Sequence, residues 1–243
     1  WQLSTVQIGG VICLPVIMIG QALSQNYGFS SALAAIAIGN AVLLLLGIVM
    51  ARLSHEKRKT TMETAADFFD ARGTLFFAFA MAFSLVCWFA IQLNMMTLGL
   101  LDLLSFSQDR EIYRVAFNTG LGILITAVAL YGIKGFRLLA NVSLPLLLFT
   151  LTYAFFTLEI KESSREYSFS IGGASLVIAL AIALVTDLPT YFRHARERKD
   201  GMLSILIIFG AVLPLLEVLG VYLSLGADEG SILDTLKRGE DSL

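Results

Sequence analysis

The chain has 243 residues, of which 57% are hydrophobic and only 15% are charged, whereas soluble domains are about 45–50% apolar and about 25% charged. This composition excludes an ordinary water-soluble fold, because so much apolar surface could not be hidden in one core. The net charge of -2 is too small to indicate a strongly acidic or basic partner, and we expect no nucleic-acid binding.

The first part of the chain carries no Asp, Glu, Lys or Arg from Trp1 to Ala51. A bilayer span needs about 20 apolar residues, so this stretch predicts two spans joined by a polar turn at residues 24–28. No basic leader followed by a small-residue cleavage site precedes it. We therefore expect no signal peptide, and a first residue other than Met indicates a trimmed or incomplete N-terminus.

Charge clusters divide the apolar runs into seven predicted spans, at about residues 5–24, 30–51, 74–101, 114–133, 137–157, 168–188 and 202–225. These runs are longer than a barrel strand of about 9–11 residues, and they do not alternate in polarity. The sequence thus predicts an all-α transmembrane fold with residues 1–243 in one transmembrane domain. It is either a complete seven-helix protein or the first part of a longer transporter.

Lys and Arg favour the cytoplasmic ends of membrane spans, and they are divided unequally between the two sets of predicted loops. One set contains Arg52, Lys57, Arg58, Lys59, Arg72, Lys134, Arg137, Arg193, Arg196, Arg198 and Lys199. The opposite set contains Arg110, Arg114, Lys161, Arg165, Lys237 and Arg238. This asymmetry predicts a cytoplasmic N-terminus and an external segment after the seventh span.

Trp88 and Gln92 are four residues apart in the third span, so they lie on the same face of a helix. The indole offers a flat surface, and the amide offers two donors and an acceptor. That pair suits a planar heterocycle, because stacking of a base on an aromatic side chain contributes about 1–3 kcal/mol. The alternative is that Trp88 packs between helices while Gln92 bonds across the bundle. Asn94 and Thr97 could line the same path or bond to neighbouring helices.

The first span contains Gly9, Gly10 and Pro15, and proline destabilises a helix interior by about 3 kcal/mol. An interruption there would free carbonyl groups between Gly10 and Cys13, which is tolerated at membrane depth where they line a cavity. The alternative is a simple kink. Cys13 and Cys87 lack the spacing of a disulfide framework or zinc site, and we expect both to be packing residues.

Glu217 is the only acid well inside a predicted span. A central acid costs about 2.5–3.5 kcal/mol on insertion scales for the comparable Asp, so it should face a polar interior or be protonated. Glu217 could carry a coupling proton, or it could be a neutral acid bonded within the bundle.

Three local patterns, in this order, resemble the nucleobase:cation symporter family. Ile38-Gly39-Asn40 and the stretch at residues 60–73 are similar to the family's second span and following loop. Cys87-Trp88-Phe89-Ala90-Ile91-Gln92 is similar to its Gly-Trp-Phe-Gly-x-Gln pattern, and residues 189–196 are similar to Asp-Tyr-x-Arg-x-x-Arg. Thr190 stands where that last signature has an acid, although Asp187 lies one helical turn away.

The resemblance implies a five-plus-five inverted-repeat transporter whose first and sixth spans are broken at the midplane, and this chain would be its first part. It also implies a substrate such as a purine, cytosine, allantoin or a hydantoin. The substrate would contact Trp88, Gln92, Asn94 and the Gly9-Gly10 segment. The coupling ion, Na+ or H+, would involve Cys13, Glu217 or Asp187. Residues 176–185 depart from the family, because they contain neither glycine nor an aromatic residue.

The leading hypothesis is therefore a cation-coupled nucleobase symporter in a bacterial inner membrane, with no cofactor. The alternatives are an amino-acid permease of the same general fold and a non-transporting sensor or truncated remnant. We do not expect an enzyme, because His55 and His194 lie in predicted loops, and no nucleophile stands at helical spacing from a base.

Overall fold

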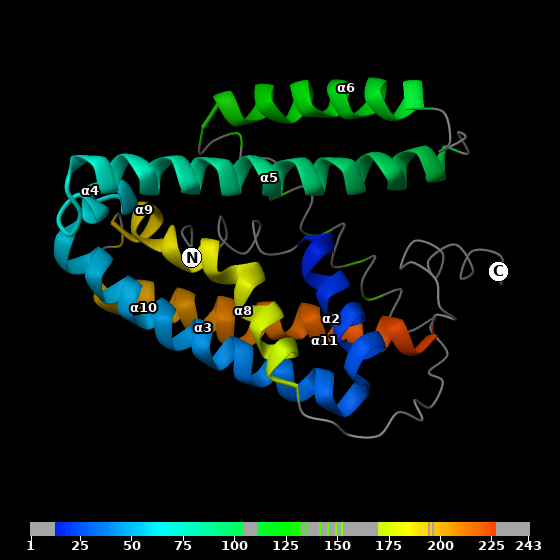
Figure 1. Cartoon of the computed structure of the whole chain (residues 1–243), viewed down its shortest axis with the longest axis horizontal. Helices are drawn as coiled ribbons and strands as arrows, with labels where there is room; N and C mark the ends of the chain where they lie inside the picture. The colour runs from blue at the N-terminus through cyan, green and yellow to red at the C-terminus, as the bar shows by residue number, and fades with distance from the viewer. Residues whose placement is uncertain are drawn as a thin grey trace.

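The computed structural model describes residues 13–104, 111–132, 170–193, 195 and 197–226, together with the isolated positions 135, 141, 145, 149 and 152. Every regular element in these ranges is a helix (Figure 1). The all-α prediction is confirmed for this part of the chain. Residues 1–12, which include Gly9 and Gly10, most of the predicted fifth span and residues 227–243 lie outside the described residues.

The helices follow one another along the chain with short connections. They are α2 (Leu14–Tyr27), α3 (Phe29–Lys57), α4 (Thr61–Ala65), α5 (Ala71–Leu103), α6 (Glu111–Leu130), α8 (Ile171–Thr186), α9 (Leu188–Phe192), α10 (Arg198–Ile207), the π-helix η1 (Ile208–Val212) and α11 (Leu213–Gly226).

Five helical segments within the described ranges are long and apolar enough to cross a membrane: Phe29–Lys57, Ala71–Leu101, Glu111–Leu130, Ile171–Phe192 and Arg198–Leu225. They correspond to the second, third, fourth, sixth and seventh predicted spans. These helices indicate an integral membrane protein. The first and fifth spans, and with them the number seven and the inverted repeat, stay predictions.

The turn between α2 and α3 is made by Gly28 alone. Its backbone has φ 83° and ψ 164°, and a positive φ carries no steric penalty for glycine. The amide of Gly28 donates to the carbonyl of Ser24 at 2.9 Å, which closes the last turn of α2. The predicted polar turn at residues 24–28 is thus mostly helix, and the chain reverses at its final residue.

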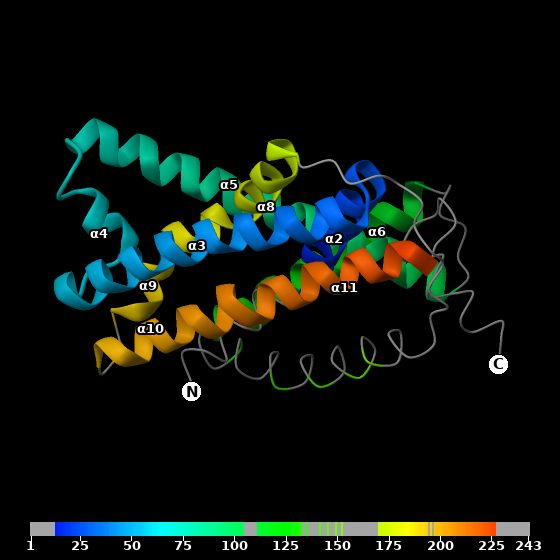
Figure 2. The same ribbon diagram turned by 90° about the horizontal axis from the view of Figure 1, so that it is seen from below.

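Helices α2, α3, α8 and α10–α11 form the packed bundle that contains the buried core. Helices α5 and α6 pack on each other and form a second layer, which lies along the upper edge of Figure 1. The view in Figure 2 shows α3 and the α10–α11 rod running side by side through the bundle. Large apolar side chains of the second layer are exposed, such as Phe76 and Ile123, as expected of surfaces that face lipid.

Small residues allow α3 and α8 to approach closely. A Cβ atom built on Gly39 of α3 would lie 2.6 Å from Val177 of α8, and one on Gly173 of α8 would lie 3.1 Å from Ala35 of α3. Membrane helices associate through such small residues because lipid provides no hydrophobic drive between helices. This contact fixes α8 against the middle of α3.

The π-helical turn η1 precedes Pro214, which lies in the first turn of α11. In an α-helix the ring of Pro214 would clash with the carbonyl of Gly210, four residues earlier. The wider π turn separates these groups and keeps the span continuous. It also sets the rotation at which the next turn, with Glu217, meets the bundle, and π turns often occur at functional sites.

Candidate functional site

Trp88 and Gln92 lie on the face of α5 that turns toward the bundle. Both side chains are half-buried, and Trp88 packs against the buried core. Phe77, Met81 and Ser84 precede them on the same helical face, at steps of three or four residues. These three line a hollow between α5 and α8. The predicted pair therefore belongs to the α5 face that the bundle and this hollow share.

The hollow has a volume of about 180 Å³ and is lined by Phe77, Ala80, Met81, Ser84, Leu85, Ala183 and Thr186. This is below the roughly 300–1,000 Å³ of typical small-molecule sites. Neither Trp88 nor Gln92 lines it, since both lie further along α5. That these two side chains share a central cavity with the first and sixth spans stays a prediction.

Asn94 and Thr97 behave differently from the pair. Asn94 is half-buried, but it follows Gln92 by only two residues and so does not share its face. Thr97 is fully buried and donates from its hydroxyl to Oδ1 of Asn118 on α6 at 2.7 Å. Of the two readings of Thr97, the bond to a neighbouring helix is the one that the structure confirms.

Cys13 marks the start of α2. Its backbone is extended, with φ −144° and ψ 153°, and the helix begins at Leu14. Pro15 therefore lies in the first turn, where its missing N–H costs nothing, and our expectation that it breaks a helix interior is wrong. The carbonyl of Cys13 accepts the amide of Val16 at 3.2 Å. The proposed roles of Gly9 and Gly10 fall outside the described residues.

The two cysteines also differ in burial. Cys13 is buried, as expected of a packing residue, whereas Cys87 on α5 is exposed. The packing prediction is therefore wrong for Cys87 within this chain, because the apolar run that contains it is the outward face of the second layer rather than a core helix.

Glu217 of α11 and Asn40 of α3 form a buried polar pair. Glu217 is fully buried and Asn40 is 3% exposed. Nδ2 of Asn40 donates to Oε2 of Glu217 at 2.5 Å and also to the carbonyl of Ile36 at 2.9 Å. Oε1 of Glu217 and Oδ1 of Asn40 have no hydrogen-bond partner. Glu217 thus faces a polar group, as the cost of a membrane acid requires.

Asn40 is a site residue that sequence reasoning missed. It was considered only as part of Ile38-Gly39-Asn40, although an amide inside an otherwise apolar helix is itself a signal of a buried polar contact. Its partner could not be found from sequence, because the two residues are 177 positions apart.

Asp187 belongs to a second polar cluster, at the end of α8. Its Oδ1 accepts from the hydroxyls of Thr190 at 2.8 Å and Thr61 at 3.2 Å. Thr61 lies at the start of α4, so the cluster joins the loop after α3 to α8 and α9. Nearby, the hydroxyl of Ser54 on α3 donates to the carbonyl of Pro189 at 3.2 Å.

The structure does not bring Asp187 and Glu217 together. Ser54, next to the Asp187 cluster, lies about 20 Å along α3 from Asn40, at 1.5 Å per residue. The three proposed coupling residues therefore occupy separate places: Cys13 at the start of α2, Glu217 in the bundle and Asp187 at its end.

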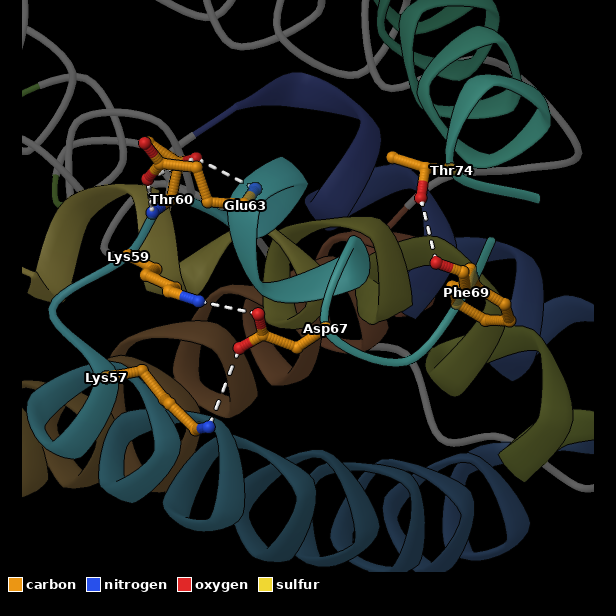
Figure 3. Close-up of polar contacts among 7 residues, drawn as sticks. All are labelled: Lys57, Lys59, Thr60, Glu63, Asp67, Phe69 and Thr74. Atoms are coloured by element: carbon orange, nitrogen blue, oxygen red, sulfur yellow. Dashed lines mark hydrogen bonds and ion pairs between the residues drawn. The ribbon is translucent and has the colours of Figure 1, made fainter. Parts of the chain in front are cut away.

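The loop after α3 is held by ionic contacts (Figure 3). Asp67 accepts from Lys59 at 2.5 Å and pairs with Lys57 at 3.5 Å. The hydrogen bond from Lys59 lowers the pKa of Asp67, and the charges of both lysines act in the same direction. The basic cluster was expected to be solvated, and the two lysines are indeed partly exposed, but both are paired with this one carboxylate.

A capping box begins α4 within the same loop (Figure 3). The amide of Thr60 donates to Oε2 of Glu63 at 2.7 Å, and the amide of Glu63 donates to the hydroxyl of Thr60 at 3.1 Å. The backbone hydrogen bond from Thr60 lowers the pKa of Glu63. Two otherwise unpaired amides are thus satisfied, which fixes the loop that presents Thr61 to Asp187.

Among the described residues, no group of three or more His, Cys, Asp or Glu side chains is placed to hold a metal ion. A scan against protein-family models and a search of curated proteins both give no match for this chain.

Proposed function

We propose that this chain forms part of a secondary transporter of nucleobases or related nitrogen heterocycles, such as purines, cytosine, allantoin or hydantoins, coupled to H+ or Na+. The observation that carries the proposal is the common face of Trp88 and Gln92 on α5. That face turns toward the bundle, with Trp88 against its core.

The chemistry of this face fits a flat, neutral and polar-edged ligand. An indole can stack on either side of a heterocyclic ring, and a carboxamide both donates and accepts, as an amide-like ring edge requires. The hollow beside Phe77 and Met81 continues the same face toward α8. Movement of α5 relative to α8 would enlarge this space, and such gating between helices is how inverted-repeat transporters alternate access.

One observation favours the amino-acid permease as a second candidate. Helix α2 begins within the bundle at the buried, extended Cys13. The N-terminus of a helix carries a partial positive charge, and such helix ends bind substrate carboxylates in transporters. An amino acid could be held there, away from the Trp88 face.

Uptake by the full protein in proteoliposomes distinguishes the two candidates. The substrates would be labelled hypoxanthine, cytosine, allantoin, a hydantoin and leucine, each with an inward H+ gradient, an inward Na+ gradient or no gradient. We expect gradient-dependent uptake of at least one heterocycle and none of leucine. Leucine uptake without heterocycle uptake would favour the permease, and a lack of uptake in all conditions would oppose both.

A further inference from the structure

The buried contact between Glu217 and Asn40 leaves two oxygen atoms unsatisfied at the same place. Nδ2 of Asn40 uses both of its hydrogens, one toward Oε2 of Glu217 and one toward the carbonyl of Ile36. Oε1 of Glu217 and Oδ1 of Asn40 are both buried, and neither has a partner. Buried polar atoms are normally paired, so two neighbouring exceptions indicate that an additional group occupies the contact.

The surroundings cannot supply that group as a side-chain cation. The elements packed against α11 are α2, α3 and η1. Their titratable and charged residues, with those of α11 itself, are Cys13, Tyr27, Arg52, His55, Glu56, Lys57 and Tyr222. The basic ones lie on the last turns of α3, more than about 15 Å along the helix from Asn40. A carboxylate at Glu217 would therefore be buried without a counter-charge, which is costly.

Close helix packing also limits the size of the missing group. A Cβ atom on Gly20 would lie 1.8 Å from the carbonyl oxygen of Glu217, so the backbone of α2 lies directly against this turn of α11. A metal cation with oxygen ligands needs a large shell, about six for the hard divalent ions. Of the described residues on α2, α3 and α11, Glu217 and Asn40 provide the two unpartnered buried side-chain oxygens.

A carboxylic acid and a primary amide can pair through two hydrogen bonds at once. The amide N–H donates to one acid oxygen, and the acid O–H donates to the amide oxygen. The first of these bonds is present, from Nδ2 of Asn40 to Oε2 of Glu217. The second would join Oε1 and Oδ1, which are the two atoms left without partners.

We propose that Glu217 and Asn40 form a proton-binding site between α3 and α11. One proton passes from hydronium to Oε1 of Glu217 and leaves water, so that the carboxylate becomes a neutral acid whose O–H donates to Oδ1 of Asn40. Release reverses this step. The site exists independently of the substrate, and only its role as the coupling site rests on the proposed transport function.

The substitution Glu217→Gln imitates the protonated state. A glutamine can donate to Oδ1 of Asn40 and accept from its Nδ2, so it keeps both hydrogen bonds without a titratable group. Asn40→Leu is the partner variant, because it keeps the bulk but removes the hydrogen-bonding groups. Conservative bulk in both variants favours folding, which circular dichroism would check before any other measurement.

Infrared spectroscopy of the full protein in proteoliposomes tests the site without any substrate. We expect a protonated-carboxyl C=O band that disappears as the pH rises, is absent in Glu217→Gln and shifts in frequency in Asn40→Leu. A band that is unchanged in Glu217→Gln would overturn the proposal. So would a wild-type band that Na+ removes at constant pH, because the group bound would then be a metal cation.

Ligand affinity separates this proposal from the proposed function. If proton binding at Glu217 is linked to binding of a heterocycle, the affinity of the wild type changes by up to about tenfold per pH unit across the titration. The affinity of Glu217→Gln should change less than about twofold over the same range. A pH-dependent affinity that persists in Glu217→Gln would place the coupling proton elsewhere. Failure to bind any heterocycle would oppose the transport function, while the infrared band would still report the site.

Discussion

Gly20 of α2 and Gly220 of α11 occupy equivalent positions at one helix crossing. A Cβ atom on Gly20 would lie 1.8 Å from the carbonyl oxygen of Glu217, and one on Gly220 would lie 1.8 Å from the carbonyl oxygen of Ile17. Each opposing carbonyl belongs to the residue three positions before the other glycine. The two backbones are therefore in reciprocal contact, and neither contact contains a side chain that could move aside.

Substitution of Gly220 by Ala should force α2 and α11 apart. Overpacking of a close contact costs about 1–3 kcal/mol, and the backbone nature of this contact places Gly220→Ala at the upper end. The measurement is the free energy of unfolding in detergent. Gly120→Ala on α6 is the matched control, because its Cβ would meet nothing within 4 Å, and Ala favours a helix by about 1 kcal/mol over Gly. Equal effects of the two substitutions would contradict the close crossing.

The ion pairs of Asp67 should stabilise the loop after α3 in a pH-dependent manner. Because the hydrogen bond from Lys59 lowers the pKa of Asp67 below its ordinary value of 3.8, this contribution is present above that value and is lost as the pH falls through the lower, folded-state pKa. Asp67→Asn should therefore lower the thermal midpoint slightly at neutral pH and have no effect in strong acid.

Salt provides the control for the Asp67 prediction. Both lysines are partly exposed, with side-chain exposures of 45% and 40%, so high ionic strength should screen their contacts. The difference between wild type and Asp67→Asn should then shrink at neutral pH. A difference that grows on acidification would contradict the assignment.

The hydrogen bond between Thr97 and Asn118 should contribute to the pairing of α5 with α6. Thr97→Val keeps the shape of the side chain but leaves Oδ1 of Asn118 without its donor at 2.7 Å. Interhelical hydrogen bonds in membranes contribute about 0.6 kcal/mol on average and up to about 1.7 kcal/mol, and a loss in this range is expected. Thr97→Ser keeps the hydroxyl and should lose less. If the serine variant loses as much as the valine variant, packing rather than the hydrogen bond holds the helices.

Topology can be tested at the two ends of the second layer. The excess of basic residues around Lys57 predicts that this end is cytoplasmic and that Glu111, at the start of α6, is external. In a protein whose two native cysteines are replaced by serine, a membrane-impermeant thiol reagent added from outside should label Glu111→Cys and not Lys57→Cys. The opposite pattern would reverse the orientation.

Several helix positions were predictable from the sequence because hydrophobic length and charge clusters determine them. The predicted span at residues 74–101 lies within α5, and the one at 202–225 lies within the continuous α10–η1–α11 segment. The ends were less predictable. Helix α3 continues beyond Ala51 to Lys57, because charged residues at a membrane surface can extend a span as helix, and the absence of charge had set the predicted boundary.

The polar contacts were less predictable than the helices, since they depend on rotation and distance between helices. Glu217 could be identified as a costly buried acid, but its partner Asn40 could not. Asp187 was assigned to coupling by resemblance, whereas the structure places it in hydrogen bonds with Thr61 and Thr190. The role of Pro15 was misjudged because a proline stabilises a helix start and disrupts a helix interior, and sequence did not locate the start of α2.

Trp88 and Gln92 remain the central prediction, because the proposed function depends on their contact with substrate. Trp88→Ala removes one stacking partner and should weaken binding of a heterocycle by about 1–3 kcal/mol. Gln92→Leu keeps similar bulk but leaves the polar edge of the ligand unpaired, at a cost of about 1–3 kcal/mol. It should therefore discriminate most strongly between ligands that differ at that edge.

The most direct test is equilibrium binding of a purine, a pyrimidine and a hydantoin to the wild type, Trp88→Ala and Gln92→Leu, each shown to be folded by circular dichroism. A control variant is Phe79→Ala, whose side chain is exposed on the same helix and should leave affinity unchanged. The proposed function predicts that Trp88→Ala lowers affinity by about 5- to 150-fold and that Gln92→Leu alters the order of preference among the three ligands. Unchanged affinities in both variants would contradict it and would show that the pair serves helix packing alone.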